Sequence, residues 1–194
     1  IGVNENIVKV YYVVDESQTK ELSYTVEYFK DGILVDEDTQ VEMITVQILK
    51  PNTLTVNKDK INLVNKYEGY VLESTDPEVI PDTVNSGDTI KVNYVRRSDL
   101  SYTVKYLEEG TNVELAAERT VNNMTFGESV TEQAIDIVGY NKVNAEETIV
   151  IAVSGNEINF YYTKRTDLSY RVEYYYNNVI DDTLTEVIDN QTYG

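Results

Sequence analysis

The side chains of this sequence that could do chemistry are carboxylates, lysine amines and tyrosine phenols. The 194 residues include 34 Asp and Glu, 16 Lys and Arg and 17 Tyr, with no Cys and no His. The lack of Cys and His excludes thiol nucleophiles, His-dependent triads and Cys-based zinc sites. Four kinds of chemistry remain to be weighed: calcium binding, glycoside hydrolysis, lysine–amide crosslinking and the stacking of tyrosine rings on sugars.

Two acidic runs, at residues 36–38 and 181–182, are the candidates for calcium binding or hydrolysis. Calcium prefers carboxylate oxygens as ligands, but the sequence has no Asp-x-Asp-x-Asp-Gly loop. Paired carboxylates hydrolyse glycosides when they flank the bond, but these acids belong to small repeats with no indication of a deep cleft. Charge runs are usually solvated, so we expect no catalytic residue, no metal site and no cofactor, and a protein that is not an enzyme.

Lysines and tyrosines provide the other two candidates. Lys9 and Lys91 hold the same place in a repeated phrase, and Asn159 replaces them in the third copy. A lysine–asparagine crosslink would need a buried lysine with an acid as its partner. Some tyrosines break the strand alternation and are candidates for stacking on sugars; the alternative is that they cover strand faces or contact a neighbouring module. These tyrosines are Tyr11, Tyr161, Tyr175 and Tyr176.

The formal net charge of −18 excludes two classes of partner. Nucleic acids bind positively charged protein surfaces, which displace counterions from phosphates. Anionic membrane surfaces likewise attract positively charged segments. No segment approaches the roughly 18 apolar residues of a membrane span. We therefore expect no nucleic-acid partner and no membrane insertion in this fragment. For a secreted protein, the signal and the anchor are expected to lie outside it.

Repeated phrases organise the chain. The phrase LSYTVEY at residues 22–28 returns with small changes at residues 100–106 and 168–174, so the copies start 78 and 68 residues apart. A second phrase, rich in aliphatic residues and Tyr, precedes each copy at residues 8–13, 90–95 and 158–163. A fixed phrase at domain-sized spacing indicates a tandem array.

The phrases divide the chain into two complete repeats and two partial ones. The complete repeats are residues 22–95 and 100–163, joined by short polar linkers. Residues 1–14 are interpreted as the closing strand of a preceding repeat, and residues 168–194 as the opening hairpin of a further, truncated repeat. We expect the two ends to be complementary, because each carries an apolar strand face without a partner in its own repeat.

Alternation with period two predicts strands in the phrases. Tyr24, Val26 and Tyr28 face one way, and residues 31–32 (Asp-Gly) form a hairpin turn signal. Residues 70–72 and 140–143 are predicted to be a third strand, and residues 127–135 a short helix on a weak i, i+4 apolar stripe. A mainly β or α+β fold follows: tandem small β-grasp-like modules in a head-to-tail rod, whose first and last strands pair in parallel. Immunoglobulin-like β-sandwich repeats are the alternative.

The phrases resemble the mucin-binding-protein repeats of Gram-positive bacterial surface proteins. The matching elements of the second repeat are Tyr-x-Val-x-Tyr at residues 102–106, a turn with Gly110, the aromatic-Gly pair at 126–127, the Gly-Tyr pair at 139–140 and the closing strand at 158–162. The first repeat departs from the pattern, since no clear aromatic-Gly pair lies near Pro51.

This resemblance implies an extracellular, cell-wall-attached region of an adhesin. It implies a stalk or spacer, or alternatively a module that binds mucin or other host glycoprotein glycans. The other expected partners are neighbouring repeats of the same chain. No binding residue is carried over, because the matching positions are core and turn residues.

Overall fold

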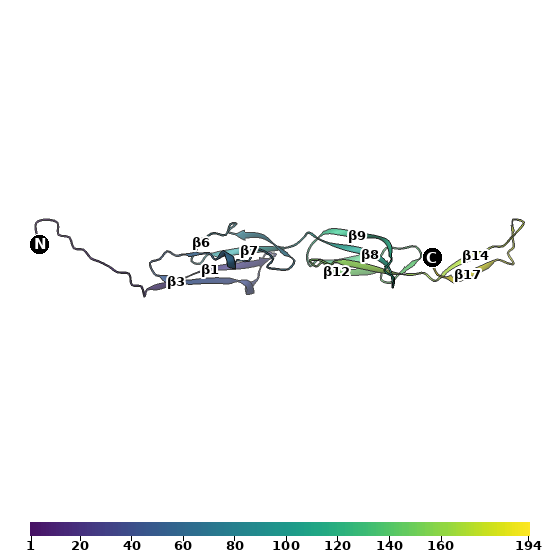
Figure 1. Cartoon of the computed structure of the whole chain (residues 1–194), viewed down its shortest axis with the longest axis horizontal. Helices are drawn as coiled ribbons and strands as arrows, with labels where there is room; N and C mark the ends of the chain where they lie inside the picture. Colours follow the sequence, from purple (N-terminus) through teal and green to yellow (C-terminus); the bar gives the residue numbers. More distant parts are fainter. The chain divides into compact units, whose positions relative to one another are not determined.

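A computed structural model describes all 194 residues, and its regular secondary structure consists almost entirely of β-strands (Figure 1). The chain divides into two compact units, Ile1–Val95 and Arg96–Gly194. The expectation of a mainly β fold is confirmed, because the remaining regular structure is limited to two 3-10 turns, η1 (Asp36–Asp38) and η2 (Lys58–Lys60). None of the helical segments has the length and apolar character that a membrane span needs.

The first unit has one five-stranded sheet and one small two-stranded sheet. In the large sheet, β1 (Thr19–Lys30) pairs antiparallel with β2 (Ile33–Leu34) and β3 (Gln40–Gln47), and parallel with β7 (Thr89–Arg96), whose other neighbour is β5 (Tyr70–Asp76). The small sheet pairs β4 (Thr53–Thr55) with β6 (Thr83–Asn85). The opening strand β1 and the closing strand β7 therefore lie side by side, in register from Thr25↔Thr89 to Lys30↔Tyr94.

The second unit repeats this strand order. The strand β8 (Leu100–Glu108) pairs antiparallel with β9 (Glu114–Met124) and parallel with β13 (Glu157–Lys164), whose other neighbour is β11 (Tyr140–Lys142). The small sheet pairs β10 (Ser129–Gln133) with β12 (Glu146–Val150). As the β-grasp-like interpretation expected, the opening and closing strands of each unit pair in parallel.

The last part of the second unit holds only hairpin strands. The strand β14 (Leu168–Val172) pairs antiparallel with β17 (Glu186–Gln191), and β15 (Tyr175–Tyr176) pairs antiparallel with β16 (Val179–Ile180). At the other end of the chain, residues 1–14 form no strand and are exposed along their whole length. The closing-strand interpretation of residues 1–14 therefore rests on sequence alone.

The predicted helix at residues 127–135 is wrong. Ser129–Gln133 is the strand β10, in register with Glu146–Val150, and the hydroxyls of Thr131 and Thr148 lie 2.7 Å apart across the pair. Burial along β10 alternates with period two, since Val130 and Glu132 are half-buried between exposed neighbours. Valine and threonine, branched at Cβ, favour a pleated, half-buried surface, and this pairing outweighs a weak apolar stripe at helical spacing.

Alternation places one face of each opening and closing strand in the core. In the first unit, Tyr24, Val26 and Tyr28 are buried, as the sequence predicted. The predicted third strand is also present in both units, as β5 and β11. The core of the first unit consists of Leu22, Tyr24, Val26, Tyr28, Leu54, Val56, Ile61, Val84, Ile90, Val92 and Tyr94. The core of the second consists of Leu100, Tyr102, Val104, Tyr106, Ala134, Ile151, Ile158, Phe160 and Tyr162.

Tyrosine hydroxyls tie the crossing segment of each unit to its sheet. In the first unit, Asn62 N–H donates to Tyr28 OH (3.0 Å), and Tyr94 OH donates to the carbonyl of Asn62 (2.7 Å). In the second, Tyr162 OH donates to the carbonyl of Ile135 at 2.9 Å. Each of these rings thus fills the core while its hydroxyl satisfies backbone groups that would otherwise lack a partner.

Candidate binding grooves

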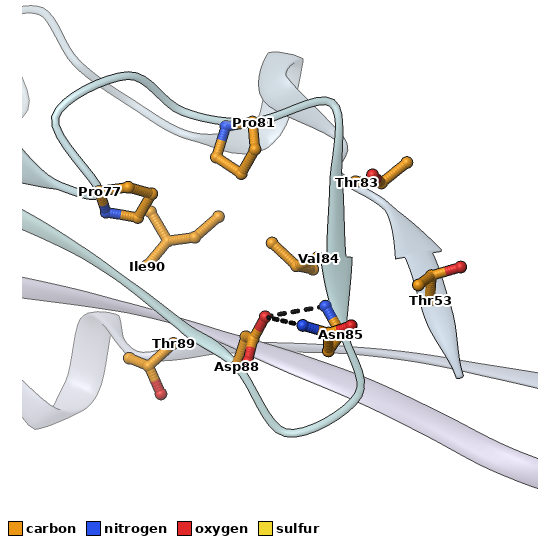
Figure 2. A pocket seen from close by; sticks show the side chains of 9 residues that line it. All are labelled: Thr53, Pro77, Pro81, Thr83, Val84, Asn85, Asp88, Thr89 and Ile90. Carbon is orange, nitrogen blue, oxygen red and sulfur yellow. Dashed lines mark hydrogen bonds between the residues drawn. The ribbon is translucent and has the colours of Figure 1, made fainter. Parts of the chain in front are cut away.

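A polar groove lies at the edge of the first unit, beside the turn that leads into β7 (Figure 2). Its volume is about 430 Å³. One wall is formed by the loop with Pro77 and Pro81, and the other by the strand β6 and the turn at Asp88. The residues that line it are Thr53, Pro77, Pro81, Thr83, Val84, Asn85, Asp88, Thr89 and Ile90.

Asp88 holds this turn closed. Its Oδ2 accepts hydrogen bonds from the backbone N–H of Asn85 (2.8 Å) and from Asn85 Nδ2 (3.3 Å), as Figure 2 shows. Gly87, in the same turn, has a φ of +95°, which favours glycine, and donates to the carbonyl of Ser23 at 2.7 Å. The lining offers threonine hydroxyls, an amide and a carboxylate to a polar ligand such as a sugar, and its residues include no aromatic ring for stacking.

The second unit also has a groove beside the turn that leads into its closing strand β13, but its other wall is formed by the linker and the opening strand β8. Its volume is about 420 Å³. The turn is held by Asn156: its Oδ1 accepts from Ala152 N–H (2.8 Å), and its Nδ2 donates to the carbonyls of Ala152 (2.9 Å) and Ser101 (3.0 Å). The lining residues are Arg97, Asp99, Leu100, Ser101, Thr103, Val153, Ser154, Gly155, Asn156 and Glu157. Both units therefore place a polar groove beside the turn that precedes the closing strand.

The first unit also contains an ionic cluster of Asp38, Lys66 and Tyr67. Asp38 accepts from Tyr67 OH (2.5 Å) and lies 3.1 Å from Lys66 Nζ, which sits 4.3 Å from the centre of the Tyr28 ring. The hydrogen bond from Tyr67 and the nearby Lys66 ammonium lower the pKa of Asp38. Burial and the bond to Asp38 raise the pKa of Tyr67. Because each charge has a partner, the cluster ties η1 and the loop at residues 66–67 to the strand β1 and leaves none of its three groups poised as an acid or base.

The acidic runs named from the sequence are not brought together. Residues 36–38 form η1, and residues 181–182 lie in the turn after β16. Asp181 Oδ1 accepts from the N–H (3.0 Å) and the hydroxyl (2.6 Å) of Thr183, which lowers its pKa. No group of three acidic side chains in the structure is arranged to hold a metal ion.

The candidate sugar-stacking tyrosines lie apart from both grooves. Tyr11 is in the exposed N-terminal segment, and Tyr175 and Tyr176 form the exposed strand β15. Tyr161 is half-buried in β13, on the face of the sheet opposite the core. None of the four lines a groove, so they form no shared platform for a sugar.

The structure places a different lysine beside Asn159 from the two that the sequence indicated. Lys9 and Lys91 are exposed, while Asn159 lies in register with Lys105, a residue that the sequence had not singled out. Lys105 Nζ lies 2.6 Å from Glu157 Oε1, and this hydrogen bond raises the pKa of Lys105. An ammonium has no lone pair with which to attack an amide, so a salt bridge is the favoured state. The strand alternation already placed Lys105 on the face opposite Val104 and Tyr106, but only the parallel register placed it beside Asn159.

No protein-family model and no curated protein matches the chain. Among solved structures, it is similar to the type 2 repeat of the mucus binding protein MUB from Lactobacillus reuteri, with 13% identity over 74% of this chain and 100% of that chain, and a TM-score of 0.28. Mub-RV matches with 15% identity over 74% of this chain and 99% of that one, and a TM-score of 0.26.

Domains 3–4 of the Streptococcal High Identity Repeats in Tandem (SHIRT) from a cell surface protein match with 15% identity over 73% of this chain and 96% of that one. Their TM-score is 0.34. The MUB match is thus a repeat of a mucus binding protein, and the SHIRT match comes from a cell surface protein.

Proposed function

We propose that this chain is a non-catalytic repeat region of an extracellular surface protein of a Gram-positive bacterium, attached to the cell wall, and that it acts as a load-bearing spacer of an adhesin. Its repeats are residues 22–95 and 100–163, flanked by a closing strand at 1–14 and an opening hairpin at 168–194. The repeated phrases and the mucus-binding and surface-protein repeats among the similar structures support this placement.

The observation that carries the spacer role is the parallel pairing of the opening and closing strands. In the first unit, Thr25–Lys30 of β1 pairs with Thr89–Tyr94 of β7. In the second, Thr103–Glu108 of β8 pairs with Glu157–Tyr162 of β13. Tension that enters a unit through its first strand and leaves through its last pulls these neighbours along their length in opposite directions. All the evenly spaced hydrogen bonds of the ladder then share the load, instead of breaking one after another.

The tyrosines support the same role. In the two complete repeats, the tyrosine rings on the core face of the opening and closing strands are buried, and hydroxyls of both units bond to the crossing segment. Side chains that are buried in the core cannot contact a ligand. The repeated part of the sequence therefore specifies a stable module rather than a recognition site.

A second candidate function is the binding of mucin or other host glycans. The specific observation in its favour is that both units carry a polar groove beside the turn that precedes the closing strand. Hydroxyls and amides in such a groove can exchange hydrogen bonds with sugar hydroxyls, as polar groups do in small-molecule sites.

Binding of the 194-residue chain to immobilised mucin separates the two functions. The spacer role predicts no saturable binding. The binding role predicts saturable binding that falls when Thr89→Ala is combined with Asn85→Ala in the first groove, but not with the matched pair Thr45→Ala and Gln40→Ala on β3, outside the grooves. Saturable binding that is lost with the groove pair would replace the spacer role with glycan recognition.

A further inference from the structure

The strand β3 forms one edge of the large sheet of the first unit. It pairs only with β1, without a register shift along Gln40–Gln47. Bonds at the ends of the ladders show which way its backbone groups point. Ile48 N–H donates to the Gln18 carbonyl, on the side of β1, and Thr25 N–H of β1 donates to the Asp88 carbonyl, on the side of β7. Because backbone groups alternate along a strand, even-numbered residues of β3 bond to β1 and odd-numbered residues point away from the sheet.

Three residues in the middle of β3 therefore carry outward backbone groups at this edge. They are Val41, Met43 and Thr45, and the side chains of the first two are each 57% exposed. From Met43 to Leu49 the sequence contains no charged residue and no proline. An apolar strand edge of this kind is a template for one more strand.

The equivalent edge of the second unit is protected, which makes the openness of β3 specific to the first. The edge strand β9 shifts register against β8 at three places and carries Glu114, Glu118 and Arg119. Bulges and charges are two of the means by which proteins prevent strand edges from pairing. In β3 the single charged residue is Glu42, whose carboxylate already lies 2.6 Å from Lys60 Nζ of the same unit.

We propose that β3 of one copy of this chain pairs antiparallel with β3 of a second copy, about a two-fold axis at Met43. This register places Met43 opposite Met43 and Val41 opposite Thr45. The outward N–H and C=O groups of all three residues then find partners in the other copy. On the opposite face of the strand, Glu42 lies across from Ile44, so no like charges oppose each other.

The free backbone groups select this register over its neighbours. A shift by one residue would set outward groups against groups that already bond to β1. A shift by two would engage Gln47 or Thr39, but the Gln47 carbonyl accepts from Lys50 N–H, and Thr39 N–H donates to the Asp36 carbonyl. A second copy fits because an antiparallel strand pair is self-complementary under two-fold symmetry, so each copy supplies what the other needs.

A charge exchange at the axis tests this inference with the full chain. Sedimentation velocity over a concentration series should show a monomer–dimer equilibrium for the wild type. Met43→Lys and Met43→Glu should each weaken it by about tenfold or more, because two like charges would lie directly opposite each other. An equimolar mixture of the two variants should associate again, since an ammonium then faces a carboxylate. The Met43 side chain is exposed, so the first unit keeps its fold.

Val71 provides the matched control on β5. Its side chain is 46% exposed, and Val71→Lys and Val71→Glu make the same changes of charge. Both variants should dimerise as the wild type does.

Crosslinking tests the register, because the chain has no cysteine of its own. Met43→Cys should form a disulfide between copies on oxidation, because facing residues of a hydrogen-bonded antiparallel pair lie within disulfide reach. Thr45→Cys should not, because each copy of this residue faces Val41 instead.

Four results would overturn the inference. A wild-type chain that stays monomeric at all concentrations would leave this edge to an extended segment of another protein. The other three are a dimer that Met43→Lys leaves intact, a mixture that associates no better than its two components, and equal crosslinking of the two cysteine variants. Mucin is absent from every arm and neither groove includes β3, so each result is independent of the proposed function.

Discussion

At the scale of single residues, tyrosine has two tasks in each unit. The ring fills the core and the hydroxyl bonds to a segment that crosses the sheet. Asn62 shows both halves of the arrangement, since its N–H donates to Tyr28 OH and its carbonyl accepts from Tyr94 OH. Phenylalanine would supply the ring alone. This accounts for tyrosine rather than phenylalanine at Tyr28, Tyr94 and Tyr162.

Tyr28→Phe should therefore destabilise the first unit by about 1–2 kcal/mol, because the N–H of Asn62 loses its acceptor in a part-buried place. The ring and its contact with the Lys66 ammonium remain. Urea unfolding followed by tyrosine fluorescence measures the change. Tyr11→Phe, at an exposed ring, is the control and should leave the midpoint unchanged. A loss of stability as small as that of the control would show that water satisfies Asn62 equally well.

Alkaline pH should destabilise the first unit. Burial raises the pKa of Tyr94 to about 12, while an unfolded tyrosine ionises near a pKa of about 10. Between these values the unfolded chain has lost the proton that the folded chain still holds, so the free energy of unfolding falls as pH rises. Denaturant titrations from pH 9 to about 12 should show this slope. Tyr94→Phe should make the slope shallower, with Tyr67, whose pKa is also raised by burial, supplying the remainder, and Tyr11→Phe should leave it unchanged. Equal slopes in the two variants would contradict this assignment.

At the scale of elements, a glycine joins the third opening hairpin to the second repeat. Tyr193 packs its ring on Gly139 and lies 5.7 Å from the ring of Tyr140, edge to face. The chain between them is tied by two backbone bonds: Arg165 N–H donates to the Gly139 carbonyl, and Tyr193 N–H donates to the Arg165 carbonyl, both at 2.9 Å. The Tyr193-Gly194 pair, which corresponds in sequence to Phe126-Gly127 of the second repeat, thus meets the Gly139-Tyr140 pair.

Gly139→Ala should release residues 165–194 from this contact. The added Cβ would overlap the Tyr193 ring, and alanine disfavours the φ of +82°. Hydrogen exchange should rise in β14 and β17 while β8 and β13 stay protected. Gly110→Ala is a matched control, because Gly110 has a φ of +80° and an added Cβ would meet open space. This variant therefore introduces only the backbone strain of alanine at positive φ. If both variants exchange alike, the contact with Tyr193 contributes nothing.

The local alternation of apolar and polar residues predicted the strands but not which strands pair with one another. Alternation identified the buried faces of the opening and closing strands, and residues 31–32 gave the expected hairpin turn, with φ of +48° and +78°. The stretch at 129–133 was misjudged because its partner, β12, lies more than ten residues away in sequence. The grooves were missed for the same reason: their lining residues come from several segments that only the fold brings together.

At the scale of the whole molecule, one strand order occurs in both units, although the first has an additional loop region around Pro51. In each, the small sheet and the crossing segment cover one face of the large sheet, and the first and last strands are neighbours. A surface protein under tension would benefit from this order, because force on the ends of a unit loads the parallel ladder in shear. The proposed spacer function would therefore depend on the pulling direction, which is a property of topology rather than of any single residue.

Single-molecule force measurements on the first unit test this claim most directly. Because the chain lacks cysteine, handles can be attached through Thr19→Cys with Val95→Cys, which shears β1 against β7. They can also be attached through Thr19→Cys with Gln47→Cys, which unzips the register pair Thr19↔Gln47 of β1 and β3. The first geometry should unfold the unit at a several-fold higher force than the second. Equal forces in the two geometries, or a lower force in shear, would contradict it.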